Sequence, residues 1–163
     1  MKIGQKIVQI AFAEVGTKEE PKNSNKQKYG AWFGFNGVAW CAIFVSWCYD
    51  QAGVTLNGYG FKKGFAGCQS AAAIFRKKGE VIERESLQVG DIILFDWNKD
   101  GRFDHVGIFN GWANKERTIA FTIEGNTSAT NQSNGGEVQS RQRDTTKISC
   151  LFAHPKQLDE VQA

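Results

Sequence analysis

The segment 91–110, DIILFDWNKDGRFDHVGIFN, contains two short apolar runs, residues 91–95 and 105–110, joined by a polar segment rich in Asp, Asn and Gly. Short apolar runs bounded by turn residues are typical of β-strands, so the segment predicts two neighbouring strands. Further runs of this kind follow at residues 118–124, 137–143 and 148–153. The second half of the chain therefore predicts a sheet.

The first half of the chain has the periodicity of helices. Apolar residues recur at helical spacing over residues 3–15, a second helix is predicted to begin between residues 38 and 41, and a third to span residues 68–78. A glycine, the usual stop signal, ends each of them at Gly16, Gly53 and Gly79. Helices followed by an antiparallel sheet indicate an α+β domain.

The length of 163 residues is enough for one compact domain with a buried core. We assign residues 1–155 to that domain and residues 156–163 to a short C-terminal tail. Residues 17–30 are polar and residues 54–67 are rich in glycine, so both segments predict irregular loops.

Composition argues against several function classes. The net charge of +3 is too small, and its charges too dispersed, to predict a nucleic-acid-binding protein. The longest apolar stretch, residues 38–48, is interrupted by Ser46 and is too short for membrane insertion. The first residues lack the long apolar run of a secretory signal, so we expect the cysteines to mature as reduced thiols.

Cys41 lies in the predicted first turn of the second helix, directly after a glycine-punctuated aromatic loop. At that position the unpaired backbone N–H groups and the helix dipole favour the thiolate, which is the nucleophilic form of cysteine. A small buried core residue is the alternative interpretation of Cys41. Cys48, two turns further along, is expected to belong to the core.

His105 opens one predicted strand and Glu124 ends the next. If the two strands pair as a hairpin in the register that places His105 opposite Glu124, their Cβ atoms lie about 5 Å apart. The carboxylate would then hold the imidazole by one ring nitrogen, as the third member of a catalytic triad does. His154, the second of two histidines, is expected to be a surface or packing residue.

Three motifs follow one another along the chain: WCAIFVSW at residues 40–47, DHVGI at 104–108 and IEGN at 123–126. Together they resemble the cysteine, histidine-dependent amidohydrolase/peptidase (CHAP) domain of peptidoglycan hydrolases, which is common in phage endolysins. The resemblance extends over residues 5–155. It implies a papain-like fold in which N-terminal helices pack on an antiparallel β-sheet.

By this resemblance, Cys41 is the nucleophile, His105 is the general base and then the acid, and Glu124 orients His105. Asn126 is a further polar position of the motif, expected to assist the histidine or the substrate. The implied reaction is hydrolysis of an amide bond of the cell-wall peptide, by an N-acetylmuramoyl-L-alanine amidase or an endopeptidase. The implied partner is bacterial peptidoglycan, and no organic cofactor is expected.

Two other function classes stay open: a wall-binding module without catalysis, and a cysteine amidase that acts on a non-wall amide. The resemblance to endolysins further implies a monomer that is made in the host cytoplasm and reaches the wall after holin-dependent release.

Aromatic residues cluster before and around Cys41. Trp32, Phe35 and Trp40 are candidates to line the substrate cleft, because exposed aromatic rings suit the apolar faces of sugars and short peptides. Packing in the core is an equally weighted alternative for each of them.

The polar segment 96–104, DWNKDGRFD, has the residue order of an EF-hand calcium loop, D-x-N-x-D-G-x-x-D. The candidate Ca²⁺ ligands are Asp96, Asn98, Asp100, Asp104 and the carbonyl of Arg102. The twelfth position is Gly107 instead of the usual glutamate, so we expect weak affinity. Some CHAP domains bind calcium, which supports the prediction, and a polar turn between two strands is the alternative.

Overall fold

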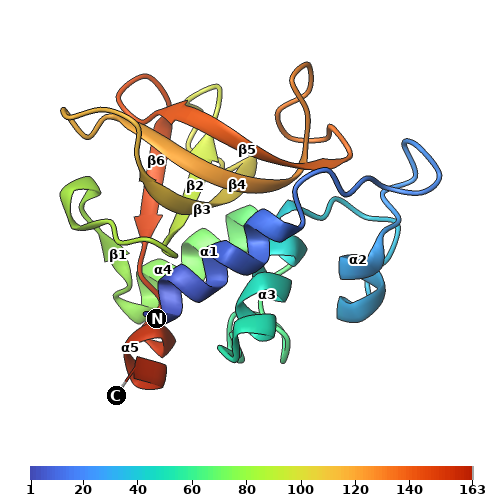
Figure 1. The fold of residues 1–163 in the computed structure, drawn as a ribbon, viewed down its shortest axis with the longest axis horizontal. Helices are drawn as coiled ribbons and strands as arrows, with labels where there is room; N and C mark the ends of the chain where they lie inside the picture. The colour runs from blue at the N-terminus through green and yellow to red at the C-terminus, as the bar shows by residue number, and fades with distance from the viewer. Residues whose placement is uncertain (163) are drawn as a thin grey trace.

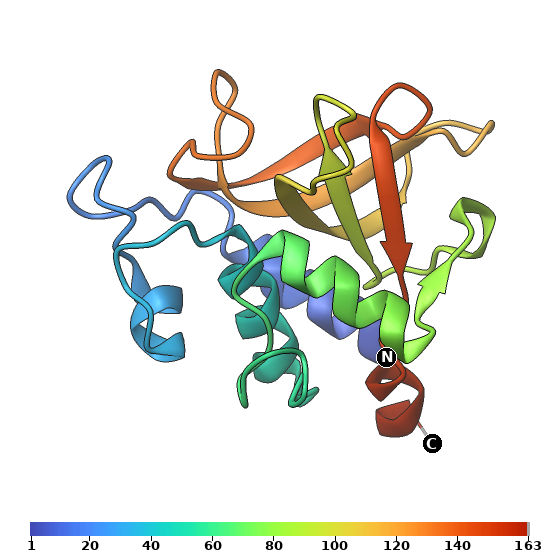
Figure 2. The ribbon, with the colours of Figure 1, turned by 180° about the vertical axis from the view of Figure 1, so that it is seen from behind.

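The computed structural model describes residues 1–162 and consists of a helical layer packed on a sheet (Figure 1, Figure 2). The helices are α1 Ile3–Ala13, α2 Lys28–Phe33, α3 Cys41–Ala52, α4 Cys68–Lys78 and α5 Gln157–Gln162. The strands are β1 Val81–Ile82, β2 Ile92–Asp96, β3 His105–Trp112, β4 Ile119–Thr127, β5 Glu137–Asp144 and β6 Ser149–Ala153. One 3-10 turn, η1 Arg84–Ser86, lies between β1 and β2.

The strands form one sheet in the order β1-β6-β2-β3-β4-β5, and all neighbouring strands are antiparallel. Helices α1 and α3 contact β3 and β4, which places the N-terminal helices against one face of the sheet (Figure 1). The predicted α+β class is therefore confirmed. None of the described helices is long and apolar enough to cross a bilayer.

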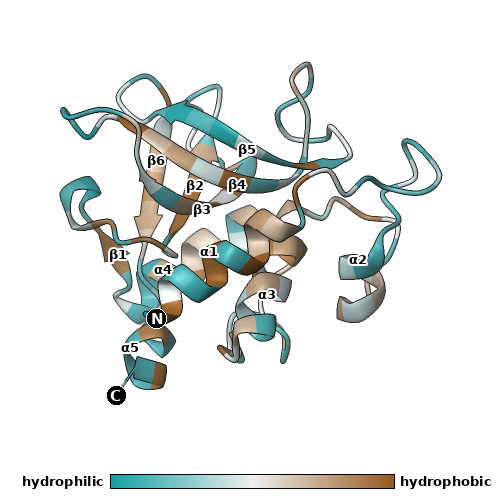
Figure 3. Cartoon of the chain, in the orientation of Figure 1, coloured by the Kyte–Doolittle hydropathy of each residue, from teal (hydrophilic) through white to brown (hydrophobic). Residues whose placement is uncertain are grey.

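Strand β2 is buried on both faces. Ile92 and Leu94 join the cluster that the helices cover, whereas Ile93 and Phe95 join a second apolar cluster on the opposite face. A strand buried on both sides reads as a continuous apolar run, which explains the uninterrupted sequence IILF. Strand β5 is the hydrophilic edge of the same sheet (Figure 3).

The register between β3 and β4 differs from the predicted one. The predicted hairpin would place Phe121 opposite Ile108, whereas the structure places Ile123 there. An offset of two residues keeps every side chain on its predicted face, because side chains alternate along a strand. His105 and Glu124 therefore still share one face, as diagonal neighbours rather than as a directly opposed pair.

The helix stop signals at Gly53 and Gly79 were predicted correctly, since both adopt left-handed backbone angles directly after α3 and α4. Helix α2 was not predicted, because its residues were assigned to loops. It begins where the Gln27 side chain accepts a hydrogen bond from the Gly30 N–H, and it ends at Gly34, whose φ is 99°.

Residues 157–162 of the predicted C-terminal tail form the short helix α5. Leu158 is buried in the main core, and α5 contacts α1 near the N-terminus of the chain (Figure 1). Tyr59 also donates a hydrogen bond to Gln157, so both apolar and polar contacts hold this short helix. Ala163 lies outside the described residues.

Close contact between α3 and β4 depends on Gly125. A Cβ atom at this position would lie 2.7 Å from the Phe44 Cβ and 3.0 Å from the Trp40 Cζ3. Only glycine lets the start of α3 approach the strand this closely. The N-terminus of α3, with Cys41, is thereby held beside the strand that carries Glu124.

Candidate active site

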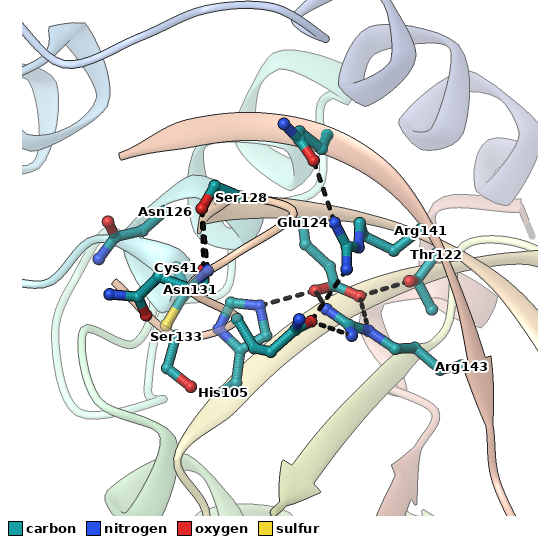
Figure 4. Close-up of polar contacts among 12 residues, drawn as sticks. Cys41, His105, Thr122, Glu124, Asn126, Ser128, Asn131, Ser133, Arg141 and Arg143 are labelled. Carbon is teal, nitrogen blue, oxygen red and sulfur yellow. Dashed lines mark hydrogen bonds and ion pairs between the residues drawn. The ribbon is translucent and has the colours of Figure 1, made fainter. Parts of the chain in front are cut away.

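Cys41 is the first residue of α3, and its side chain is buried with 5% of its surface exposed. The predicted position at a helix N-terminus is therefore confirmed. Figure 4 shows its sulfur atom on the side of the His105 ring that faces away from Glu124. Helix α3 supplies the thiol and the sheet supplies the imidazole, so the pair spans the boundary between the two layers.

His105 and Glu124 are both fully buried and directly bonded. The Nε2 atom of His105 lies 2.8 Å from the Oε1 atom of Glu124 (Figure 4). The Nδ1 atom of His105 is buried and has no hydrogen bond of regular geometry among the described residues. The carboxylate thus fixes one ring nitrogen and leaves the other on the side of Cys41.

Arg143, from β5, completes the group and was not predicted. Its Nε donates to the Oε2 of Glu124 over 2.8 Å and its Nη2 donates to Oε1 over 2.5 Å, a two-pronged contact. Thr122 donates a further hydrogen bond to Oε2. A buried carboxylate requires such partners, because an unpaired buried charge is strongly unfavourable. A glutamate expected to be buried within a strand needs a cation beside it, and this requirement could have pointed to an arginine on the neighbouring strand.

Gly107 makes room for the diagonal contact. A Cβ atom at Gly107 would lie 2.8 Å from the Cγ of Glu124 and 3.3 Å from the Cβ of Thr122. The Glu124 side chain therefore lies across the Gly107 backbone on its way to His105. This glycine compensates for the register offset that separates His105 from Glu124 along the strands.

Aromatic rings enclose the imidazole. The ring of Trp97 lies 5.9 Å from that of His105, at 28°, and stacks on Phe95 at 5.0 Å and 4°. The guanidinium of Arg143 lies 4.8 Å from the Trp97 ring. These rings exclude water from the ion pairs, which strengthens the electrostatic interactions among them.

The surroundings of Glu124 and His105 shift the pKa of each side chain. Burial alone would raise the pKa of Glu124, but the hydrogen bonds from Arg143 and His105 outweigh it and hold this pKa at about 2. Burial alone would lower the pKa of His105, but its contacts with Cys41 and Glu124 raise it to about 9. At neutral pH the carboxylate is ionised and the imidazole is protonated.

Cys41 has a pKa well below the ordinary value of a thiol. The main cause is hydrogen bonding to Cys68, whose Sγ lies 3.7 Å from that of Cys41; the adjacent His105 adds to it, and together they outweigh burial. The same contact raises the pKa of Cys68, so Cys68 keeps its proton and donates it. Cys41 and His105 therefore form a thiolate–imidazolium pair.

Asn126 bonds the residues that follow β4. Its Oδ1 accepts a hydrogen bond from the Gly136 N–H, and its Nδ2 donates to the Oδ1 of Asn134. The residue is fully buried and adopts a φ of 55°. In this structure Asn126 fixes the loop 128–136 rather than contacting His105.

The loop 128–136 also forms hydrogen bonds with Trp97 and Arg143, which surround His105 and Glu124. Gln132 accepts hydrogen bonds from both Arg141 and Arg143, and Ser133 accepts one from the Trp97 indole over 2.6 Å. Sequence reasoning gave the loop no role, because its Ser, Asn and Gly residues read only as turn formers.

The three aromatic residues predicted to line the cleft differ in their exposure. Trp40 is fully buried, stacks on Tyr29 at 5.6 Å and donates to Glu19, so its assignment as a cleft residue was wrong. Phe35 is 43% exposed, and Trp32 is partly buried. Only these two remain available as surface contacts.

The predicted calcium loop is a hydrogen-bonded turn. The Asp96 carboxylate accepts from the backbone N–H groups of Asp100 and Gly101, and the Asp104 carboxylate accepts from that of Trp97. Among the described residues there is no group of three or more His, Cys, Asp or Glu that could hold a metal ion. In this arrangement the carboxylates of Asp96 and Asp104 accept backbone hydrogen bonds, and calcium binding stays a prediction from the sequence.

Comparison with known proteins identifies the family. The model of the CHAP domain matches residues 32–126, more than half of the chain, including Cys41, His105 and Glu124. The chain belongs to the CHAP family. Arg143 lies outside the matched segment, so the CHAP motifs alone do not reveal it. A search of curated proteins finds no match.

Solved structures share the papain-like fold predicted for this CHAP domain. The Resuscitation Promoting Factor Interacting protein RipA has a TM-score of 0.55 at 15% identity, and a hypothetical invasion protein of Mycobacterium tuberculosis has 0.55 at 16%. Each match covers 93% of this chain but 61% of the other chain. RipD from Mycobacterium tuberculosis, described as a non-catalytic NlpC/p60 domain protein adapted to peptidoglycan binding, has 0.56 at 13%, covering 94% of this chain and 98% of RipD. These likenesses show the fold.

The lowered pKa of Cys41 gives a testable pH dependence. Because the thiolate is already formed, the rate of alkylation of Cys41 by iodoacetamide should be constant through neutral pH. Cys150, whose pKa burial raises to about 12, is the internal control and should stay unlabelled until strongly alkaline pH. Peptide mass spectrometry after short pulses measures both rates. A Cys41 rate that rises about tenfold per pH unit up to pH ~8.5 would contradict the thiolate.

The substitution Arg143→Met tests the support of Glu124. It should lower the free energy of unfolding by about 3–5 kcal/mol, because it leaves a buried carboxylate without its cation. The double variant Arg143→Met/Glu124→Gln should recover most of that loss, since it no longer contains a buried carboxylate that lacks its arginine partner. Urea titration measures both.

Arg141→Met is the matched control, because Arg141 occupies the same face of β5 and bonds Gln132 and Gln139 but not Glu124. Equal destabilisation by the Arg141 and Arg143 substitutions would refute a special role for the two hydrogen bonds from Arg143 to Glu124.

Proposed function

We propose that this protein is a cysteine hydrolase that cleaves an amide bond of the peptidoglycan peptide. The observation that carries the proposal is the continuous chain of buried groups from Cys41 through His105 and Glu124 to Arg143. A structural role alone would not require a thiolate–imidazolium pair backed by a buried carboxylate. Membership of the CHAP family supports the choice of amide hydrolysis and of peptidoglycan.

In the proposed reaction, the Cys41 thiolate attacks the carbonyl carbon of the scissile amide. The backbone N–H of Cys41, in the first turn of α3, is a donor for the developing oxyanion. The imidazolium of His105 gives its proton to the leaving amine, and a thioester remains on Cys41. Neutral His105 then takes a proton from the water that hydrolyses the thioester. Glu124 keeps the imidazole oriented and stabilises its charge throughout.

A hollow lined by charged residues offers space for a charged peptide. It measures about 300 Å³ and lies between the segment 18–23 and the start of β5, with Lys18, Glu19, Lys22 and Glu137 among its lining residues. Glu19 also bonds Trp40, the residue before Cys41. Mixed charges suit a wall peptide, which carries both amino and carboxylate groups.

A wall-binding module without catalysis is the second candidate, favoured by the likeness to RipD. The two candidates differ in whether purified protein releases soluble fragments from sacculi. Mass spectrometry of these fragments would also distinguish an amidase from an endopeptidase, and a non-wall amidase would release none.

The substitutions Cys41→Ala and His105→Ala should each reduce sacculus hydrolysis on the order of 10⁴–10⁶-fold, because each removes a reacting group. His154→Ala is the control. It removes ion pairs to Asp91 and Asp159 and should lower stability, but it leaves turnover nearly unchanged. Fragment release by the three purified variants measures this. Normal release by Cys41→Ala would exclude the cysteine mechanism.

The biological setting is a further part of the proposal: a phage endolysin that acts on the wall after holin-dependent release. The resemblance of its motifs to endolysin domains supports it. Lysis of cells with an exposed wall by externally added protein tests this capacity.

Calcium binding also stays a proposal, supported by the residue order of segment 96–104. Binding would require the carboxylates of Asp96 and Asp104 to exchange backbone hydrogen bonds for the cation. We expect a higher melting temperature in millimolar calcium and loss of this shift in Asp100→Ala. The absence of any calorimetric heat and of any shift in melting temperature would leave the segment as a turn.

A further inference from the structure

The side chain of Cys68 faces that of Cys41 between two helix N-termini. Cys41 is the first residue of α3, Cys68 is the first residue of α4, and their sulfur atoms lie 3.7 Å apart. Cys68 belongs to none of the three CHAP-like motifs and is not a reacting group in the proposed hydrolysis. The proposed nucleophile therefore has a second thiol in direct contact with it.

The two sulfur atoms differ in protonation, with a thiolate at Cys41 and a thiol at Cys68. Peroxides oxidise thiolates in preference to thiols, and the sulfenic acid that forms condenses with a thiol that lies next to it. Cys68 is in the position where such a resolving thiol is required.

The surroundings permit a bond between these two cysteines. A disulfide has an S–S distance of about 2.05 Å, so the atoms must approach from their present contact. Cys68 follows directly on the glycine-rich segment 54–67, at the start of α4. Cys41 is 5% exposed and Cys68 is 8% exposed, so neither residue is completely enclosed.

The other cysteines are not placed for this chemistry. Cys48 is fully buried within α3, and burial raises its pKa. Cys150 lies on β6, where its sulfur contacts the carbonyl of Ile148. Neither is in sulfur–sulfur contact within the described residues.

We propose that Cys41 and Cys68 are a redox modification site, at which a peroxide forms a reversible disulfide that blocks the nucleophile. The Cys41 thiolate attacks one peroxide oxygen, the O–O bond breaks, hydroxide leaves, and the sulfur becomes a sulfenic acid. The Cys68 sulfur then attacks the Cys41 sulfur, the S–O bond breaks, and water leaves with the Cys68 proton. Two thiol groups lose two electrons in total, and the peroxide is reduced to two waters once the hydroxide is protonated.

The consequence for activity rests on the proposed function, since the disulfide removes the attacking thiolate. Cytosolic thiols reverse disulfides, whereas oxidising compartments preserve them. The enzyme would therefore be active in reducing surroundings and inactive where peroxides accumulate.

The test treats the reduced full-length protein with one equivalent of hydrogen peroxide in buffer containing a metal chelator. We expect a mass lower by two hydrogen atoms, a linked peptide pair containing Cys41 and Cys68, and loss of sacculus hydrolysis that dithiothreitol restores. Cys150→Ser is the matched control and should behave as the unmodified sequence does.

Treated with two or more equivalents of peroxide, Cys68→Ser and Cys68→Ala should give no linked pair and should instead accumulate Cys41 sulfinic acid, whose loss of activity dithiothreitol does not reverse. Both variants are tested so that a folding defect in one of them does not decide the result. A sulfinic acid without any linked pair in the unmodified protein would overturn the proposal. The linked pair is detected by mass alone, so its formation in a protein that never hydrolyses sacculi would reject the proposed function and keep the disulfide.

Discussion

The buried contact between Glu124 and Arg143 supports the rest of the candidate site. An ionised carboxylate with no exposed surface is tolerable only with a cation beside it, and Arg143 supplies two parallel hydrogen bonds. The ionised carboxylate in turn stabilises the protonated form of His105. The imidazolium then helps to keep Cys41 as a thiolate. A charge on the edge strand is thus transmitted through three side chains to the start of a helix.

Two glycines make this transmission geometrically possible. Gly107 lets the Glu124 side chain cross its neighbour strand, and Gly125 lets α3 approach β4. A methyl group at either position would overlap neighbouring atoms, and such overpacking typically costs 1–3 kcal/mol. The positions of Cys41 and Glu124 therefore depend on the absence of a side chain at Gly125 and Gly107.

Local signals in the sequence predicted a large part of this structure. Stop glycines and apolar spacing defined α3 and α4, and apolar runs between turns defined β2 to β6, because these features are decided within a few residues. The family motifs brought Cys41, His105 and Glu124 together. Arg143 escaped prediction because its role depends on the pairing of β4 with β5, a long-range property.

Other differences have the same origin. Trp40 resembles a cleft residue in sequence, but its burial depends on how Tyr29 and Glu19 fold back onto it. The short helices α2 and α5 lack the length that makes periodicity visible. The register between β3 and β4 also shifts at a bulge between Phe109 and Trp112, which no local pattern indicates.

The loop 128–136 has a kinetic consequence. Its contacts end on Trp97 and Arg143, so any displacement of the loop breaks hydrogen bonds of the residues around the imidazole. Loop motions take nanoseconds to microseconds, whereas hydrolytic turnover commonly takes milliseconds or longer. If the loop opens at such rates, it opens and closes many times within one cycle of the proposed hydrolysis. Its influence would therefore enter through the equilibrium fraction of closed molecules, and not through the speed at which it closes.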